Sequence, residues 1–469
     1  MSKRKEKTEK KSTRAGRRDI RAEKAKIFIF CAVMLAGAVV SFIMPLRPEY
    51  SESEKRKLAV FPAFSTHALF EGTYFDDINT WFSDTFPFRE HFMQLNGKLE
   101  KVWGIRRVAI HGEVDNGDEI PDVPLIEEPS SSDVPPSSMP GEQITTTETV
   151  PDFTTDAPSV SQTTPSQSDE VKTQTLGAVL IVGDSGYEYY NFNQTAATSY
   201  INTVRRAASL LEGKANLYLL LTPTSIDITL ADSVRSTVKS SDQKKAINYF
   251  YSSVPSSVKT VPVYDTLRAH RSEPVFFRTD HHWTALGAYY AYREFAAVKG
   301  VTPDEIGRFK TKTFGGFLGS FYSDTLNEGL AKNPDTVTAY VPYSNAKLVF
   351  YDTKGAATNW PIINNVENYK SHSKYSTFVA GDQPFEIITN SDLKDGSSCL
   401  VIKESFGNAM IPFLIGHYQT VYVVDPRYYT ANTLTGLVSQ KGIKDVLIID
   451  NISATRSRVY TAAIDKFVR

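Results

Sequence analysis

Two adjacent histidines stand beside an aspartate in the run Asp280-His281-His282-Trp283-Thr284, just before an expected helix at Thr284–Val298. A carboxylate two residues from a histidine can accept its ring N–H, which fixes the tautomer and leaves the other nitrogen as a base. The run therefore indicates a histidine base oriented by an aspartate. Two alternatives stay open. In the first alternative, the aspartate caps the helix beside two surface histidines. In the second, the run binds a metal ion, although we find no partner ligands among the other six histidines and the two cysteines.

A serine follows an apolar run at a second junction. Cys399–Ile402 reads as a strand, Lys403-Glu404-Ser405-Phe406-Gly407 follows, and an apolar helix is expected from Asn408. A serine at the start of a helix lies near free backbone N–H groups that can stabilise an oxyanion. Position alone leaves Ser405 equally well explained as a nucleophile or as a helix cap.

A third junction carries Gly183-Asp184-Ser185-Gly186 after the apolar run Ala178–Val182. Gly-Asp-Ser after a strand is the nucleophile block of ordinary SGNH hydrolases, which also need an Asp-x-x-His near the C-terminus. His417 is the last histidine, and no such motif follows it. Ser185 is therefore expected to lie in a turn and not to act as the nucleophile.

The elements around these junctions alternate between short apolar runs and helical runs over residues 176–469. This pattern predicts an α/β domain of three layers with a mostly parallel sheet. The expected strands are Ala178–Val182, Leu217–Leu221, Val258–Val263, Leu348–Tyr351, Leu400–Ile402, Val421–Val424 and Val446–Ile449. The expected helices are Thr195–Glu212, Asp242–Ser252, Thr284–Val298, Asn408–Ile415 and Ala431–Ser439.

The N-terminal part carries a membrane signal. Residues 27–44 contain no charge, and residues 1–26 hold 12 Lys and Arg against 4 acids. The length and the preceding bases predict a single transmembrane anchor with residues 1–26 in the cytoplasm and the rest of the chain outside the cell. A cleaved signal peptide is the alternative, although its apolar region would be shorter.

Between the anchor and the main domain we expect two segments. Residues 50–112 contain amphipathic, aromatic-rich stretches and predict a short helical neck. Residues 113–175 predict a disordered insertion, because residues 113–170 hold 14 acids without one Lys or Arg, and 26 of the 47 residues in 129–175 are Ser, Thr or Pro. The formal net charge of −1 is therefore a sum over segments of unlike charge. Outside residues 1–26 and 113–170 the net charge is about +5, which gives no argument for nucleic-acid binding.

The run Asp280-His281-His282-Trp283 is the signature of the DHHW protein family, which the chain resembles over most of its extracellular part. That family is similar to alginate O-acetyltransferase proteins of the AlgX and AlgJ type, whose catalytic domain is a permuted SGNH-hydrolase fold. Further runs that look like family motifs are Arg56–Pro62, Asp84–Arg89, Gly183–Tyr187, Gly315–Tyr322 and Asp425–Tyr429.

The resemblance implies a catalytic triad of Ser405 as nucleophile, His282 as base and Asp280 as the residue that orients the base. Glu404 stands where the family usually has an aspartate. An oxyanion would be held by the backbone N–H of Ser405 and by Asn408. Five residues are candidates for a sugar groove, with ordinary core or rim packing as the open alternative: Trp283, Tyr322, Arg427, Tyr428 and Tyr429.

The function that follows is a membrane-anchored O-acetyltransferase acting on a cell-surface polysaccharide, without metal or cofactor. The resemblance implies that the acetyl group arrives through a membrane-bound O-acyltransferase partner. Two alternatives remain: an acetylesterase with the same triad, in which water resolves the acyl-enzyme, and a non-catalytic wall assembly protein on an inherited fold.

Overall fold

The computed structural model describes residues 28, 32, 49–51, 56–65, 73–86, 91, 108–112, 114–122 and 178–469. These residues belong to two compact units. The described residues up to 91 form part of the first unit, and those from 108 onward form part of the second. The site residues expected from the sequence all lie in the second unit.

The first unit contains a two-stranded antiparallel ribbon and a helix. The ribbon pairs β1 (Tyr50–Ser51) with β2 (Arg56–Lys57), and the helix is α3 (Thr73–Asp84). The ring of Phe61 packs edge-on against Trp81 of this helix, at 4.8 Å between centroids. The helix falls in the stretch expected to be helical, whereas the ribbon was not expected. Residues 87–90 and 92–107 of the expected neck lie outside the described residues.

The predicted anchor at 27–44 lies outside the described residues, apart from Phe28 and Ala32. Among the helices that the structure describes, none combines the length and the apolar content that a bilayer crossing requires. The anchor therefore stays a prediction from the sequence.

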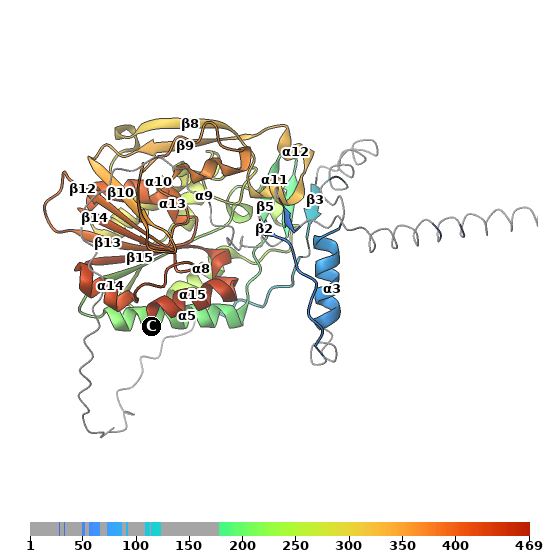
Figure 1. Cartoon of the computed structure of the whole chain (residues 1–469), viewed down its shortest axis with the longest axis horizontal. Coiled ribbons are helices and arrows are strands. Elements are labelled where there is room, and N and C mark those ends of the chain that lie inside the picture. The colour runs from blue at the N-terminus through green and yellow to red at the C-terminus, as the bar shows by residue number, and fades with distance from the viewer. Residues whose placement is uncertain are drawn as a thin grey trace, which may run out of the picture. The chain divides into compact units, whose positions relative to one another are not determined.

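The second unit is built on an eight-stranded mixed sheet (Figure 1). In spatial order its strands are β11 (Ala357–Trp360), β10 (Ala346–Tyr351), β12 (Phe385–Asn390), β14 (Thr420–Val424), β13 (Ser398–Lys403), β15 (Asp445–Asn451), β6 (Asn216–Thr222) and β7 (Val258–Thr260). The five strands from β14 to β7 are parallel, while β12, β10 and β11 are added in antiparallel fashion. The sheet is thus mixed, with five parallel strands as the prediction of a mostly parallel sheet requires and three antiparallel strands that were not expected as such.

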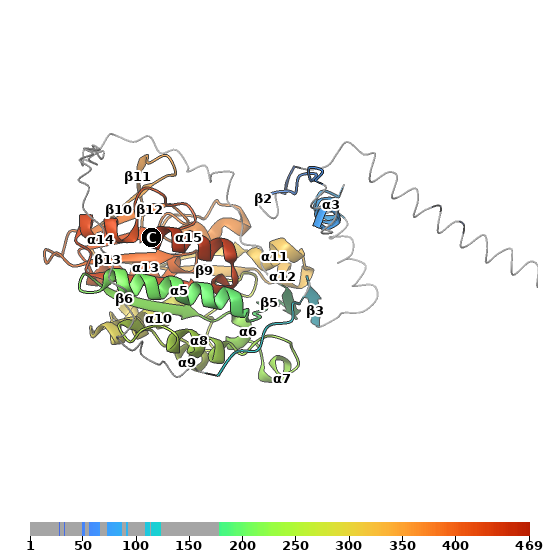
Figure 2. The ribbon, with the colours of Figure 1, turned by 90° about the horizontal axis from the view of Figure 1, so that it is seen from below.

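Helices cover both faces of this sheet. One core contains Leu217, Leu219 and Leu221 of β6, and the other contains Tyr218 and Leu220, as the alternation of side chains along a strand requires. The helices of the first core are α5 (Gln194–Leu211), α8 (Gln243–Ser252), α14 (Leu434–Lys441) and α15 (Arg458–Val468). Those of the second are α9 (Tyr264–Ala269), α10 (Ala285–Lys299) and α13 (Gly407–Leu414). In Figure 2, α5 runs across the near face of the sheet.

Two smaller antiparallel sheets complete the unit. One joins β3 (Val108–His111), β4 (Val179–Val182) and β5 (Ser185–Glu188), and the other joins β8 (Lys310–Phe317) and β9 (Asp335–Val341). The sequence placed Ala178–Val182 among the strands of the main domain, and it lies in the separate three-stranded sheet. Four further short helices among the described residues are α6 (Ser225–Ile228), α7 (Asp232–Arg235), α11 (Ser320–Thr325) and α12 (Glu328–Ala331).

The first part of the expected disordered insertion is ordered. In residues 114–122 the side chain of Ile120 is buried, and the N–H of Asp118 donates to the carbonyl of Phe192 at 2.7 Å. The Asp118 carboxylate accepts the N–H of Gln194 at 2.8 Å. The buried Ile120 side chain and the hydrogen bonds of Asp118 thus hold this acidic segment on the domain. Residues 123–177 lie outside the described part of the chain.

Candidate active site

Two loops bring the predicted reactive residues together. Ser405 follows β13 at its carboxyl end, where functional loops of parallel sheets gather, and α13 begins two residues later. The start of α13 needs a glycine, because a Cβ on Gly407 would meet the Cβ of Lys403 at 2.6 Å. Asp280 and His282 lie in the loop before α10. Thr284 caps that helix through its hydroxyl, which accepts the N–H of Gly287.

Asp280, His282 and Ser405 form a continuous hydrogen-bonded chain. The Nε2 atom of His282 lies 2.7 Å from Ser405 Oγ, and its Nδ1 lies 2.6 Å from Asp280 Oδ1. The backbone N–H of His282 also donates to Asp280 Oδ1, at 2.9 Å. Asp280 and His282 are buried and Ser405 is half-buried. With Nδ1 protonated toward Asp280, Nε2 is free to accept the serine proton.

The Asp280 carboxylate is held in its ionised form. Burial would raise its pKa, but the neighbouring His282 and His281 and the hydrogen bonds to the carboxylate outweigh burial and lower the pKa. One of these bonds comes from the N–H of Ser320 at 2.8 Å. The backbone at Gly319 lies close against Asp280, so that a Cβ added to Gly319 would lie 2.2 Å from the Cβ of Asp280.

His281 is turned to a different partner. Its Nδ1 lies 2.7 Å from the hydroxyl of Ser320, and burial, together with the adjacent His282, lowers the pKa of His281 to about 3. Asp280, His281 and His282 offer ligand atoms within 4.8 Å of one another, a spacing that could suit a metal ion. However, His282 would have to give up Asp280 or Ser405 to ligate, so the donors fit a proton relay better than a metal centre.

Tyr375 is a site residue that the sequence analysis missed. Its ring stacks on the imidazole of His282, at 4.0 Å between centroids and 14° between planes. Its hydroxyl donates to the carbonyl of Ser405 at 3.1 Å. Tyr375 therefore touches both loops and restricts the ring of His282 to one orientation. It lies in a 3₁₀ segment, Ser371–Thr377, without a recognisable motif, so no sequence signal pointed to it.

Glu404 also contacts the serine. The buried carboxylate lies 3.1 Å from Ser405 Oγ through Oε2, which also accepts the N–H of Phe406 at 3.1 Å. Its Oε1 accepts the N–H of Asn451, at the end of β15, at 2.9 Å. One side chain thus ties the serine loop to the neighbouring strand.

The two expected oxyanion donors differ in availability. Among the described residues, none accepts a hydrogen bond from the backbone N–H of Ser405. The side chain of Asn408 is buried and donates one amide N–H to Asp382 at 2.9 Å, which leaves its second amide hydrogen. The backbone donor is therefore the better placed of the two.

Three of the expected groove residues are engaged by other groups of the protein. Trp283 is fully buried, and its indole N–H donates to the carbonyl of Phe406 at 2.9 Å, so it is a core residue and the prediction of a groove role is wrong. The guanidinium of Arg427 is paired with Asp425 and Asp382. Tyr429 packs against Phe385 at the rim of a core.

Tyr322 and Tyr428 are half-buried, so each has part of its surface open to a ligand. Ser185 lies in the β4–β5 hairpin, as expected, and its hydroxyl donates to the adjacent Asp184 at 3.2 Å.

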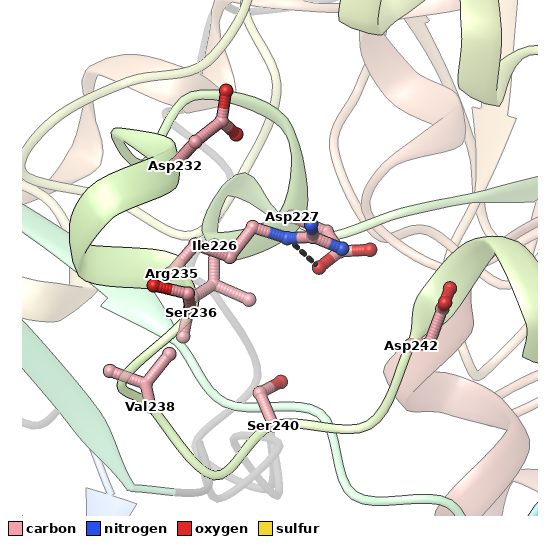
Figure 3. Close-up of a pocket in the computed structure, with 8 residues that line it drawn as sticks. All are labelled: Ile226, Asp227, Asp232, Arg235, Ser236, Val238, Ser240 and Asp242. Carbon is pink, nitrogen blue, oxygen red and sulfur yellow. Dashed lines mark hydrogen bonds and ion pairs between the residues drawn. The ribbon is translucent and has the colours of Figure 1, made fainter.

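A pocket of about 410 Å³ lies away from these residues (Figure 3). It is lined by Ile226, Asp227, Asp232, Arg235, Ser236, Val238, Ser240 and Asp242. Its charged groups are used within the protein: Asp227 accepts from Arg235 at 2.7 Å, and Asp242 caps α8. We therefore assign no site to it.

Comparisons with known proteins give a family match and two similar solved structures. The sequence model of the DHHW protein family matches residues 54–133 and 151–424, more than half of the chain. A crystal structure of a DHHW family protein from Eubacterium siraeum is similar at 26% identity and a TM-score of 0.57, covering 62% of this chain and 96% of that one. Bacillus cereus PatB1 with a sulfonyl adduct is similar in fold at 17% identity and a TM-score of 0.51, covering 62% and 98%. No curated protein matches the chain.

Proposed function

The chain belongs to the DHHW protein family, and on that premise we propose that it is an O-acetyltransferase that modifies a cell-surface polysaccharide. Ser405 would be the nucleophile, His282 the base and Asp280 the residue that orients the base. The observation that carries the proposal is the 2.7 Å separation of Ser405 Oγ and His282 Nε2, continued at 2.6 Å to Asp280. This is the reach that proton transfer requires.

In the first half-reaction, Ser405 Oγ attacks the carbonyl carbon of an acetyl ester while His282 Nε2 takes the hydroxyl proton. The imidazolium keeps its Nδ1–H on Asp280, whose negative charge stabilises it. When the tetrahedral intermediate collapses, the bond to the donor oxygen breaks and His282 returns the proton to that oxygen. The acetyl group stays on Ser405.

The second half-reaction runs in the opposite sense. A sugar hydroxyl gives its proton to His282 and attacks the acetyl-serine, and the bond between Ser405 and the acetyl carbon breaks. The proton then passes to Ser405 Oγ, and the sugar leaves as its acetyl ester. In both halves the oxyanion would face the N–H of Ser405 at the start of α13, with Asn408 as a second donor.

The proposed location rests on the sequence, and the proposed acetyl donor rests on the family resemblance. An anchor at 27–44 with the domain outside the cell would bring the site to wall or capsule polymers. The family resemblance suggests that a membrane-bound O-acyltransferase supplies the acetyl group across the membrane. The polysaccharide class also comes from this resemblance.

A labelling experiment tests the proposal. We expect a sulfonyl fluoride to modify Ser405, as the sulfonyl adduct of PatB1 suggests, and an acetyl ester to leave one acetyl group on the same residue, both located by peptide mass spectrometry. Adding acceptor glycan then separates the two enzymatic alternatives: a transferase yields acetylated glycan, an esterase only acetate. If neither reagent labels Ser405, the result favours the alternative of a non-catalytic wall assembly protein.

A further inference from the structure

The side chain of Asn408 is held in one orientation by Asp382. Asn408 stands one helical turn after Ser405, whose carbonyl accepts the Asn408 backbone N–H at 3.2 Å. Its side-chain Nδ2 donates to Asp382 Oδ1 at 2.9 Å. An ionised carboxylate can only accept hydrogen bonds, so the nitrogen and not the oxygen of the Asn408 amide has to face it.

This orientation leaves the amide oxygen of Asn408 without a donor. The side chain is buried, and among the described residues none donates to its Oδ1. A buried oxygen without a hydrogen bond is costly, so the packing of Asn408 alone does not explain the arrangement. The arrangement does keep the second hydrogen of Nδ2 available, and an N–H donor is what a developing oxyanion requires.

Two cations fix the carboxylate of Asp382. Lys403 Nζ lies 3.1 Å from Oδ1, and the Arg427 guanidinium donates to Oδ2 at 2.8 Å. Burial would raise the pKa of Asp382, but the charges of Lys403 and Arg427 outweigh burial and lower the pKa. Asp382 is therefore ionised and acts as an acceptor toward Asn408.

The same cations tie Asp382 to the serine loop. Lys403 is the last residue of β13, two positions before Ser405, and its side chain has no exposed surface. Lys403 also donates to the carbonyl of Gly381 at 3.0 Å, which holds the backbone next to Asp382. Arg427 comes from the segment after β14, the parallel neighbour of β13. Asp382 thus has a fixed place at the carboxyl ends of these two strands.

We propose that Asp382 is a positioning residue, whose carboxylate turns the amide of Asn408 so that Nδ2 donates its second hydrogen to the oxyanion formed on the acetyl carbonyl. This inference rests on the proposed function of Ser405. Asp382 itself touches no reacting atom. Lys403 and Arg427 balance its negative charge, which limits repulsion between Asp382 and the oxyanion.

A double-mutant cycle tests whether Asp382 acts through Asn408. The quantity measured is kcat/KM for release of p-nitrophenol from p-nitrophenyl acetate by the purified full-length protein, which reports acylation. Asn408→Ala removes the donor, and we expect a loss of about a hundredfold, as for other oxyanion donors. Asp382→Asn frees the amide to turn, and we expect a loss of at least about tenfold.

The double variant decides between positioning and simple structural support. Once Asn408 is alanine, Asp382 has no amide to hold, so we expect the double variant to match Asn408→Ala within about threefold. If the two losses multiply, Asp382 acts independently of Asn408 and the proposal is wrong. It is also wrong if either single variant keeps the wild-type kcat/KM.

Asp425→Asn is the matched control. Asp425 is a buried carboxylate that pairs with the same Lys403 and Arg427, whereas the Asn408 amide donates to Asp382. We expect Asp425→Asn to lower the melting temperature, and any loss of kcat/KM to persist in full in the Asn408→Ala background. If that loss also disappears there, the charge cluster as a whole orients Asn408, and the specific role of Asp382 is rejected.

A second substitution covers the case in which Asp382→Asn does not fold. Asp382→Glu keeps a negative charge for Lys403 and Arg427 but shifts the carboxylate relative to Asn408. We expect a smaller loss of kcat/KM that again vanishes in the Asn408→Ala background, and a loss that persists there would contradict the proposal. Ser405→Ala in the same assay keeps the two ideas apart: unchanged acylation rejects the proposed function itself, whereas abolished acylation with a multiplicative cycle rejects only the role of Asp382.

Discussion

His282 is held on three sides by groups of different kinds. Asp280 fixes the proton on Nδ1, Ser405 occupies Nε2, and the ring of Tyr375 lies against the imidazole face. An imidazole held in this way has few unproductive orientations, which would favour its proposed role as the base. The contact with Tyr375 also joins the base to the serine loop, because its hydroxyl bonds the Ser405 carbonyl.

Replacing Ser405 tests the nucleophile. Ser405→Ala removes the atom that would carry the acetyl group, and we expect acetyl transfer to fall by at least about a thousandfold, as in other enzymes with a serine triad. Ser185→Ala is the control, because the Ser185 hydroxyl lies in the β4–β5 hairpin and donates to the adjacent Asp184, so the change should leave the rate unchanged. Transfer would be measured as acetate esterified to glycan, and a Ser405→Ala protein of near-normal rate would remove Ser405 from the reaction.

Replacing Asp280 tests the orienting role. Asp280→Asn keeps the size of the side chain but puts an amide against Nδ1, which favours the wrong tautomer of His282. The same change in a serine protease lowers turnover about ten-thousandfold, and we expect a fall of several orders of magnitude. Steady-state kinetics should show the loss in kcat with little change in KM. A loss confined to KM would instead assign Asp280 to substrate binding.

At the scale of elements, burial decides what the sequence could predict. β6, β13 and β15 are runs of buried apolar residues, and all three were expected within two residues of their observed ends. β8 is mostly exposed and rich in Lys and Thr, and β12 carries a buried Glu386, so neither matches an apolar or alternating pattern. β8 and β12 were missed for this reason, whereas β10, on the antiparallel side of the main sheet, was expected as Leu348–Tyr351.

The same reasoning applies to the site. Ser405, His282 and Asp280 stand at junctions of recognisable elements, and the resemblance to the DHHW family implied their roles as a triad. Tyr375 and the contacts of Glu404 depend on which loops meet in space, and spacing along the chain does not encode this. Trp283 was misplaced because an aromatic side chain next to a reactive histidine fits a groove or a core equally well, and only its burial separates them.

Gly319 offers a test of the contact between two such elements. Its backbone lies against Asp280, where an added Cβ would come within 2.2 Å of the aspartate Cβ and carboxylate. We expect Gly319→Ala to push Asp280 away from His282, lowering activity at least tenfold and the melting temperature by several degrees. Gly315→Ala is the control, since a Cβ there meets nothing within 4 Å. Equal effects of the two changes would mean that the close approach is not what matters.

At the scale of the whole molecule, composition was a partial guide. The acidic segment 113–170 was expected to be disordered throughout, yet Asp115 is paired with Arg456 and Asp118 bonds Gln194. Acidic residues that find partners on a domain, next to one buried apolar residue such as Ile120, are compatible with order. The average composition of a long segment does not reveal such local contacts.

The domain also buries acids whose ionisation should control its stability. Glu386 lies in β12 with no exposed surface, and neither carboxylate oxygen accepts a hydrogen bond from a described residue. Burial raises its pKa to about 8, although Lys403 acts in the opposite direction. Burial likewise raises the pKa of Glu188 and of Asp450 to about 7. In the folded protein these three carboxyls hold their protons far more tightly than in the unfolded chain.

The sign of the effect follows from this difference. Between the usual pKa of 4.5 and the folded value of about 8, the unfolded chain loses the Glu386 proton while the folded protein keeps it, so the free energy of unfolding falls as pH rises. We expect the melting temperature to drop between pH 6 and pH 9, and to drop less in Glu386→Gln, which cannot ionise. Glu367→Gln, at an exposed position, should follow the wild type. A wild-type melting temperature that rises over this range, or a Glu386→Gln protein that parallels it, would show that Glu386 keeps its ordinary pKa in the fold.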